Sequence, residues 1–167
     1  MPGTDLPDAG CMFVRYYLEL ALPFEEVENT LLREPQDWIP GLAEAAEARG
    51  EVLLAEVGFG PPGRRLEKRV QIELGRPFQL ASKSVLPMAW RATGPLTVFP
   101  SLEADIEVAP IGKSRTQLSV SARYRPPLGR LGQAIDRTLL HRVAEATIKD
   151  FVDRAGEALT SRLVTVS

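Results

Sequence analysis

The chain has 167 residues, 44% of them hydrophobic, which is enough for one domain with a substantial buried core. Its 20 Lys and Arg residues nearly balance 22 Asp and Glu residues, so the net charge of -2 gives no electrostatic reason to expect a nucleic-acid partner or an anionic membrane surface. The chain has one cysteine, which excludes an internal disulfide and favours a location in the cytoplasm. No apolar run approaches the roughly 18 residues that span a bilayer, so stable membrane insertion is not expected.

The N-terminal end is predicted to be a flexible tail in front of the domain. Residues 1–11 are polar and rich in Gly and Pro, and they lack the basic start and apolar run of a signal peptide. Residues 12–164 are expected to form a single domain. Its first strand is predicted over 13–22, because apolar residues there alternate with their neighbours at a period of two.

Two short helices are predicted after this strand. The first begins at Phe24, has acidic residues in its first turn, and ends near Arg33 because Pro35 restricts the residue before it. The second covers 43–48, a run of good helix formers, and is expected to end at Arg49-Gly50.

The next part of the chain is predicted to be an antiparallel meander. Turn residues separate its segments, and connections this short favour antiparallel neighbours. The predicted strands are 51–59, 66–74, 78–93, 102–108 and 116–124.

A long C-terminal helix follows Pro126-Pro127 and runs to about Leu163. It carries two apolar rows, so we expect it to contact two different partners. The row expected to pack against the sheet contains Leu140, Ala144, Ile148, Phe151 and Leu159. The other row, expected to face the short helices or a partner, contains Leu128, Leu131, Ile135, Leu139 and Val143.

Three segments carry a resemblance to a known family: Trp38-Ile39-Pro40, the run from Leu86 to Ala92, and Tyr124-Arg125-Pro126-Pro127-Leu128-Gly129. With the order of elements, they resemble the START and birch-pollen-allergen-like superfamily (SRPBCC), in its polyketide cyclase/dehydrase and lipid-transport branch. The resemblance implies an α+β helix-grip fold, in which a curved antiparallel sheet of six or seven strands wraps around the long C-terminal helix. It also implies a cavity between that sheet and the helix.

Inward strand positions, the sheet-facing helix row and residues near the opening are the cavity candidates, although for each apolar one plain core packing is an alternative. They are Tyr16, Leu18, Trp38, Val57, Phe59, Lys68, Val70, Leu80, Ser82, Ser84, Met88, Trp90, Leu102, Leu118, Val120, Leu140, Ala144, Ile148 and Phe151. The two serines need hydrogen-bond partners from protein, water or ligand. Lys68 is interpreted as a side chain at the rim or as an anchor for an acidic ligand.

No catalytic or metal-binding pattern is present in the sequence. It lacks a GxSxG elbow, a phosphate loop of Walker type and a dinucleotide fingerprint. The single histidine, His141, lies next to Arg142 and four residues before Glu145, which favours a solvated or hydrogen-bonded structural role. We therefore expect no cofactor and no metal.

These patterns lead to three hypotheses. The first is a non-catalytic protein that binds a small hydrophobic or amphipathic ligand, lipid or polyketide-like, between sheet and helix. The second is an aromatase or cyclase acting on a polyketide-like substrate, with Tyr16, Ser82, Ser84 and Lys68 as its polar groups. The third is an interaction module or homodimer that uses part of the helix's additional apolar row.

Overall fold

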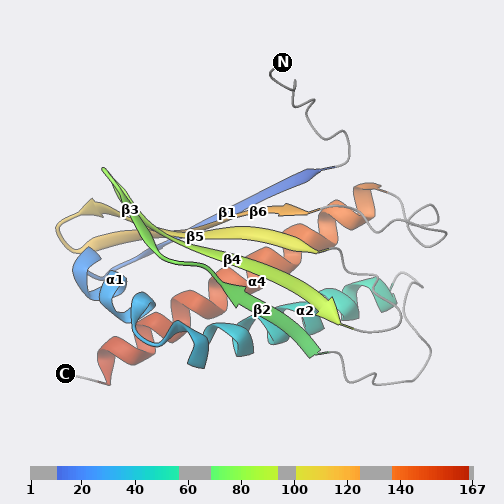
Figure 1. Cartoon of the computed structure of the whole chain (residues 1–167), viewed down its shortest axis with the longest axis horizontal. Coiled ribbons are helices and arrows are strands. Elements are labelled where there is room, and N and C mark those ends of the chain that lie inside the picture. Colours follow the sequence, from blue (N-terminus) through green and yellow to red (C-terminus); the bar gives the residue numbers. More distant parts are fainter. Residues whose placement is uncertain (1–10, 57–68, 94–100, 125–136, 166–167) are drawn as a thin grey trace, which may run out of the picture.

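The computed structural model describes residues 11–56, 69–93, 101–124 and 137–165. Its elements, in chain order, are β1 (Met12–Leu20), α1 (Phe24–Leu32), the 3-10 turn η1 (Pro35–Asp37), α2 (Ile39–Glu56), β2 (Arg69–Leu74), β3 (Phe78–Leu80), β4 (Lys83–Thr93), β5 (Leu102–Gly112), β6 (Arg115–Tyr124) and α4 (Arg137–Val164). The strands form one layer, and α2 and α4 run beneath it (Figure 1). Except for Cys11, the expected N-terminal tail lies outside the described residues.

The six described strands form one antiparallel sheet in the order β1-β6-β5-β4-β2, with β3 paired to β4 off this path. Along β5, Leu102, Ala104, Ile106 and Val108 are buried on the inner face, toward α4. Between them, Glu103, Asp105 and Glu107 lie on the outer face. The predicted alternation is therefore confirmed, and the fold is the predicted helix-grip arrangement.

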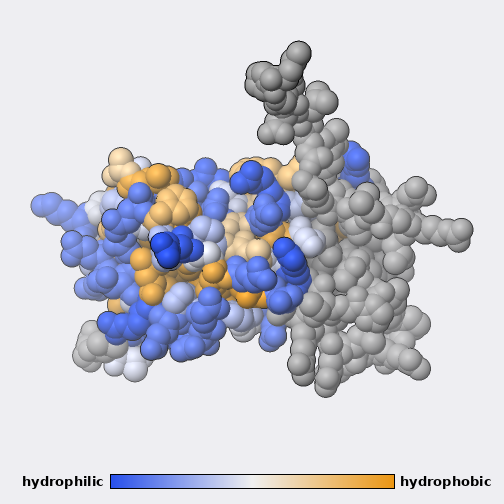
Figure 2. Space-filling view, in the orientation of Figure 1, coloured by the Kyte–Doolittle hydropathy of each residue, from blue (hydrophilic) through white to orange (hydrophobic). Residues whose placement is uncertain are grey.

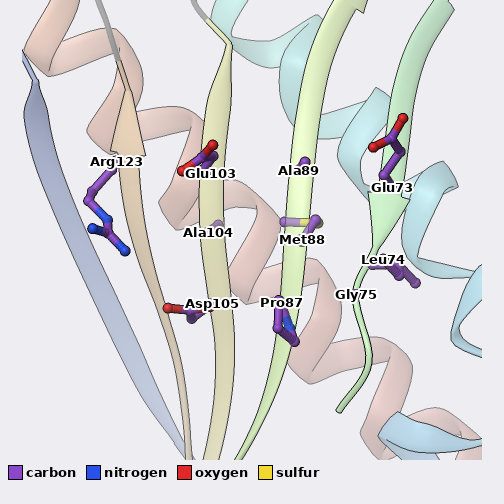
Figure 3. A pocket seen from close by; sticks show the side chains of 10 residues that line it. All are labelled: Glu73, Leu74, Gly75, Pro87, Met88, Ala89, Glu103, Ala104, Asp105 and Arg123. Carbon is purple, nitrogen blue, oxygen red and sulfur yellow. The ribbon is translucent and has the colours of Figure 1, made fainter. Parts of the chain in front are cut away.

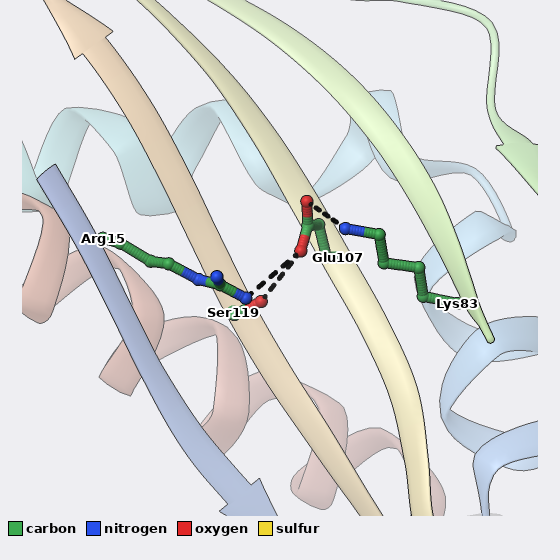
Figure 4. Close-up of polar contacts among 4 residues, drawn as sticks. All are labelled: Arg15, Lys83, Glu107 and Ser119. Carbon is green, nitrogen blue, oxygen red and sulfur yellow. Dashed lines mark hydrogen bonds and ion pairs between the residues drawn. The ribbon is translucent and has the colours of Figure 1, made fainter. Parts of the chain in front are cut away.

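Glu107 is the centre of a polar network on the outer face (Figure 4). Its side chain is only 12% exposed, and it accepts a hydrogen bond from Lys83 Nζ at 2.9 Å and one from Ser119 Oγ at 3.4 Å. Arg15 lies 3.6 Å from its second carboxylate oxygen. Four neighbouring strands, β1, β6, β5 and β4, each contribute one member of this network.

The second helix is longer than the sequence predicts, and the strand predicted over 51–59 is wrong for 51–56. α2 continues through Gly50 to Glu56. Leu, Ala and Glu are good helix formers, and α2 packs along α4, so tertiary contacts offset the roughly 1 kcal/mol cost of an internal glycine. In 51–59 the alternation of apolar residues is too short to distinguish a strand from a helix.

The single strand predicted over 78–93 is a hairpin of β3 and β4. Leu80 pairs with Lys83, so Ala81 and Ser82 form a two-residue turn. Leu80 is 51% exposed and Ser82 is also exposed, so their expected inward positions are wrong. No Gly or Pro marks this turn, and alternation continues through it unchanged.

The sheet-facing row predicted for the long helix is confirmed. Leu140, Ala144, Ile148, Phe151 and Leu159 of α4 are all buried. At Gly156 the helix approaches β1 closely, because a Cβ atom there would lie 3.1 Å from Leu18 Cδ2. In the other predicted row, Val143 is buried and Leu139 is partly buried, whereas Leu128, Leu131 and Ile135 lie outside the described residues.

Candidate functional site

The middle of the space between sheet and α4 is packed core. Leu118, Val120, Ile148 and Phe151 were all cavity candidates, and each has an exposed fraction of 0%. No water-sized space adjoins these side chains, so they leave no room for a ligand among them. Slightly exposed side chains of the core include Leu102 and Ala144, both 6%, and Leu102 pairs with Trp90 near the end of β4.

A row of directly opposed residues crosses the inner face at this end. It consists of Ile72, Trp90, Leu102, Tyr124 and Met12, on β2, β4, β5, β6 and β1. We call it the cross-sheet row. Opposed residues of antiparallel strands point to the same face, so all five side chains lie on the side of α4. In Figure 1 this is the right-hand end of the sheet, close to the N-terminal half of α4.

A buried carboxylate contacts the cross-sheet row from α2. Glu47 is 2% exposed, and its Oε2 accepts a hydrogen bond of 3.2 Å from Trp90 Nε1. The Trp90 ring also contacts the Phe151 ring of α4, with centroids 5.9 Å apart and planes tilted by 58°. Glu47 therefore places a buried carboxyl group against a wall that is otherwise apolar.

The second polar group of the cross-sheet row is the hydroxyl of Tyr124. It lies 3.1 Å from His141 Nδ1, while His141 Nε2 lies 3.2 Å from Glu145 Oε1, one helical turn further along α4. Burial, and secondarily the negative charge of Glu145, raises the pKa of Tyr124 from 10.0 to about 12. The hydroxyl therefore stays protonated at neutral pH, and the hydrogen-bonded role expected for His141 is confirmed.

Other cavity candidates make contacts within the protein. Ser84 is buried at the opposite end of β4, and its hydroxyl donates to a carboxylate oxygen of Glu28 on α1, so the protein supplies its partner. Tyr16 and Leu18 are partly buried on the edge strand β1, where Lys149 Nζ lies 5.4 Å from the Tyr16 ring centroid. The hydrogen bond with Asp153 is the main cause that raises the pKa of Lys149.

Trp38 does not join the cross-sheet row. It is 7% exposed, and its ring lies 5.1 Å from the Arg162 guanidinium near the C-terminal end of α4. Arg162 follows His141 by roughly 30 Å along the helix, from a rise of about 1.5 Å per residue. Trp90 instead contacts Phe151, eleven residues earlier on the same helix, so the two tryptophans contact different parts of α4.

The remaining candidates divide into buried, exposed and undescribed positions. Met88, Leu102, Leu140 and Ala144 are buried. Leu80 and Ser82 are exposed. Val57, Phe59 and Lys68 lie outside the described residues, and Val70 is described only as a backbone position of β2 opposite Ala92.

Two hollows lined by described residues lie away from the inner face. One, of about 340 Å³, is on the outer face of the sheet, where Glu73, Asp105 and Arg123 point away from the helices (Figure 3). Another, of about 670 Å³, lies between α1 and the C-terminal end of α4 and includes Arg33 and Leu163. Apolar and hydrophilic residues are interspersed over the surface seen in Figure 2.

Several solved structures are distantly similar to this chain over most of its length. The Zhui aromatase/cyclase from Streptomyces sp. R1128 is 12% identical, covering 92% of this chain and 96% of its own, with a TM-score of 0.46. A conserved protein from Geobacillus kaustophilus is 17% identical over 90% of this chain and 96% of its own, with a TM-score of 0.49. Ara h 8.0201 is 10% identical over 91% of this chain and 99% of its own, with a TM-score of 0.48.

The chain has the helix-grip fold. The order of its elements and the sheet covering α4 show this directly. No family model and no curated protein matches the sequence. Likenesses this distant carry no argument about activity, so the site must be interpreted from its own residues.

Sequence reasoning missed Glu47 and Tyr124. Glu47 lies in a run of alanines and glutamates, where nothing distinguishes it from the exposed Glu44. Tyr124 did carry a signal, because it continues the inward alternation of Leu118, Val120 and Ala122. In the described residues no cluster of His, Cys, Asp and Glu could hold a metal ion, and no helix is both long and apolar enough to cross a membrane.

Proposed function

We propose that the protein binds a small hydrophobic or amphipathic molecule between the sheet and α4, beside the cross-sheet row, without covalent catalysis. The observation that carries this proposal is the pair of buried polar groups, the Glu47 carboxylate and the Tyr124 hydroxyl, in a wall that is otherwise apolar. Small-molecule sites typically combine a large apolar lining with a few polar groups that fix the ligand's orientation.

The position of these groups supports the same proposal. Further along the inner face, Ile106 and Val120 are at most 1% exposed, so they leave little room for a ligand there. At the cross-sheet row, Leu102 and Ala144 retain some exposed surface. An apolar ligand body beside these two residues would place its polar end within reach of the Tyr124 hydroxyl. We infer that the ligand is amphipathic.

The aromatase or cyclase alternative has weaker support. Of its four polar candidates, Ser82 is exposed in a turn and Ser84 is bonded to Glu28 near the far end of the sheet. Tyr16 lies on β1 beside Lys149, so these three side chains do not converge on one position. The homodimer hypothesis stays a prediction, and light scattering coupled to size-exclusion chromatography would decide it.

Native mass spectrometry of the purified protein tests the proposal first, and a copurifying small molecule is the expected result. The uncharged fluorescent probe phenylnaphthylamine then tests binding in solution. In a Trp38→Phe variant, whose remaining tryptophan is Trp90, bound probe should change the tryptophan emission. In a Trp90→Phe variant, which retains Trp38 beside Arg162 and outside the cross-sheet row, the change should be much smaller.

Two substitutions on one face of α4 locate the site. Ala144→Leu adds volume where the inner face is slightly exposed, and we expect it to weaken probe binding by about tenfold, which corresponds to about 1.4 kcal/mol. Ala155→Leu is the matched control, about three turns further along the same buried face. Equal effects of both variants, or no binding across a broad panel of apolar probes, would refute the proposed site.

A further inference from the structure

The imidazole of His141 connects the inner face of the sheet with solvent. Its Nδ1 lies 3.1 Å from the hydroxyl of Tyr124, which is 1% exposed, and its Nε2 lies 3.2 Å from Oε1 of Glu145. The side chains of His141 and Glu145 are 37% and 57% exposed. The His141 and Tyr124 rings are nearly parallel, with an interplanar angle of 24° and centroids 6.5 Å apart. Solvent protons can therefore reach a group that contacts an interior hydroxyl.

The numbers of hydrogen-bond donors and acceptors on His141, Tyr124 and Glu145 determine which atom donates in each hydrogen bond. An ionised carboxylate only accepts, so the Nε2 atom of His141 must carry a hydrogen in order to bond Glu145. A neutral imidazole has one donor, and its Nδ1 is then an acceptor to which Tyr124 must donate. A protonated imidazole donates from both nitrogens, so the Tyr124 oxygen becomes the acceptor. Its own hydrogen is then free for another partner.

We propose that protonation of His141 turns the Tyr124 hydroxyl into a donor toward a bound ligand, so that the site prefers ligands with an anionic oxygen and takes up a proton when it binds them. This inference rests on the proposed function and specifies its ligand class as an anionic amphiphile, such as a molecule with a carboxylate, sulfonate or phenolate group. The imidazolium charge, which lies next to that hydroxyl, favours the same ligands.

The groups that surround the ring are consistent with this coupling. Within the described elements, Tyr124 faces His141 from β6, and Glu145 lies one turn after it on α4. Arg137 lies one turn before it on the same helix and is exposed, while β1 places the uncharged Met12 opposite Tyr124. These are the charged groups that the described elements place next to the ring, and the ring itself is partly exposed to solvent.

His141 is the only histidine in the chain, so NMR signals of its imidazole are assigned without ambiguity. The ring is titrated alone, with the anionic probe anilinonaphthalene sulfonate, and with uncharged phenylnaphthylamine. We expect the anionic probe to raise the midpoint of the His141 titration by about one pH unit, because binding and protonation are reciprocally linked. The uncharged probe should leave it unchanged. This measurement requires no variant.

Affinity measurements test the same linkage from the ligand's side. The affinity for the anionic probe should rise by about tenfold from about pH 8 to about pH 5.5, the range in which histidines commonly titrate. Tyr124→Phe and His141→Gln should remove this rise. Tyr17→Phe is the matched control, because Tyr17 is 59% exposed on the outer face of β1.

The possible outcomes separate the two proposals. If the anionic probe leaves the His141 midpoint unchanged, or if its affinity rises equally in Tyr124→Phe and His141→Gln, the coupling is refuted while binding of the uncharged probe still stands. An equal rise in those variants would assign the pH effect to the overall charge of the protein. If neither probe binds at any pH, both the coupling and the proposed function are refuted.

Discussion

Replacing each tryptophan with phenylalanine measures the hydrogen bond that holds the buried carboxylate. Trp90→Phe removes the Nε1 donor that lies 3.2 Å from Glu47 Oε2. Trp38→Phe removes the same group from a tryptophan that is similarly buried, but Nε1 of Trp38 has no hydrogen-bond partner within the described residues. The loss of ring volume is the same in both variants. Their difference in stability therefore reports the Trp90 hydrogen bond.

The magnitude follows from burial and charge. Removing the donor of a buried hydrogen bond costs about 1–3 kcal/mol, and Trp90 and Glu47 are both at most 3% exposed, so solvent cannot replace the lost donor. Trp38→Phe weakens a contact with Arg162 that contributes about 0.5–1 kcal/mol. We expect the free energy of unfolding to fall about 1–2 kcal/mol further in Trp90→Phe than in Trp38→Phe. At about 2–4 °C per kcal/mol, the Tm difference should be about 2–8 °C.

Urea denaturation followed by circular dichroism measures both variants, and the remaining tryptophan of each gives an independent fluorescence signal. Equal slopes against urea concentration would show that the variants unfold to the same extent, which the comparison requires. Losses that agree within about 0.5 kcal/mol would refute the stabilising role of the hydrogen bond. A larger loss in Trp38→Phe would show that the contact of Trp38 with Arg162 contributes more to stability than the Trp90 hydrogen bond.

Three further predictions concern other parts of the molecule. Because the folded state raises the pKa of Tyr124 from 10.0 to about 12, its contribution to stability is complete below about pH 10 and is lost as pH rises toward 12; alkaline denaturation of Tyr124→Phe should lack this loss. Gly156→Ala should change the free energy of unfolding by less than about 1 kcal/mol in thermal unfolding, because the higher helix propensity of alanine offsets the close contact of its Cβ with Leu18. Gly156→Val should lower it by more than about 2 kcal/mol, because the larger side chain overpacks this contact. Glu107→Gln should lower the free energy of unfolding by about 1–2 kcal/mol in urea denaturation, because the Glu107 side chain is 12% exposed and bonded to Lys83. Glu19→Gln should lower it by less than about 1 kcal/mol, because the Glu19 side chain is 46% exposed beside Arg115. Equal losses in the two variants would contradict this prediction.

The sheet and the long helix could be predicted from the sequence because their patterns are long. β5 alternates over many residues, and the apolar row from Leu140 to Leu159 repeats over five turns, so local exceptions do not hide either period. The end of α2 and the β3–β4 turn could not be predicted, because they depend on packing and on a two-residue connection without Gly or Pro.

The candidate site was harder to predict than the fold. Trp90 was correctly expected to point inward, because it lies on a long alternating strand. The burial of Glu47 depends on how α2 packs against α4 and the sheet, and a glutamate in an alanine-rich helix gives no sign of it. Tyr124 and His141 are seventeen residues apart, and only the crossing of β6 by α4 brings them together.

The pairing of β1 with β6 has a consequence for how the molecule is made. Met12 pairs with Tyr124, and Leu20 pairs with Thr116, so the first strand of the sheet has its partner about a hundred residues later in the chain. β4, β5 and β6 can associate through short connections as they leave the ribosome, but β1 must wait until β6 has been synthesised. A nascent chain that ends before Arg115 therefore exposes an unpaired, half-apolar strand, which is the stage at which a chaperone would be most useful.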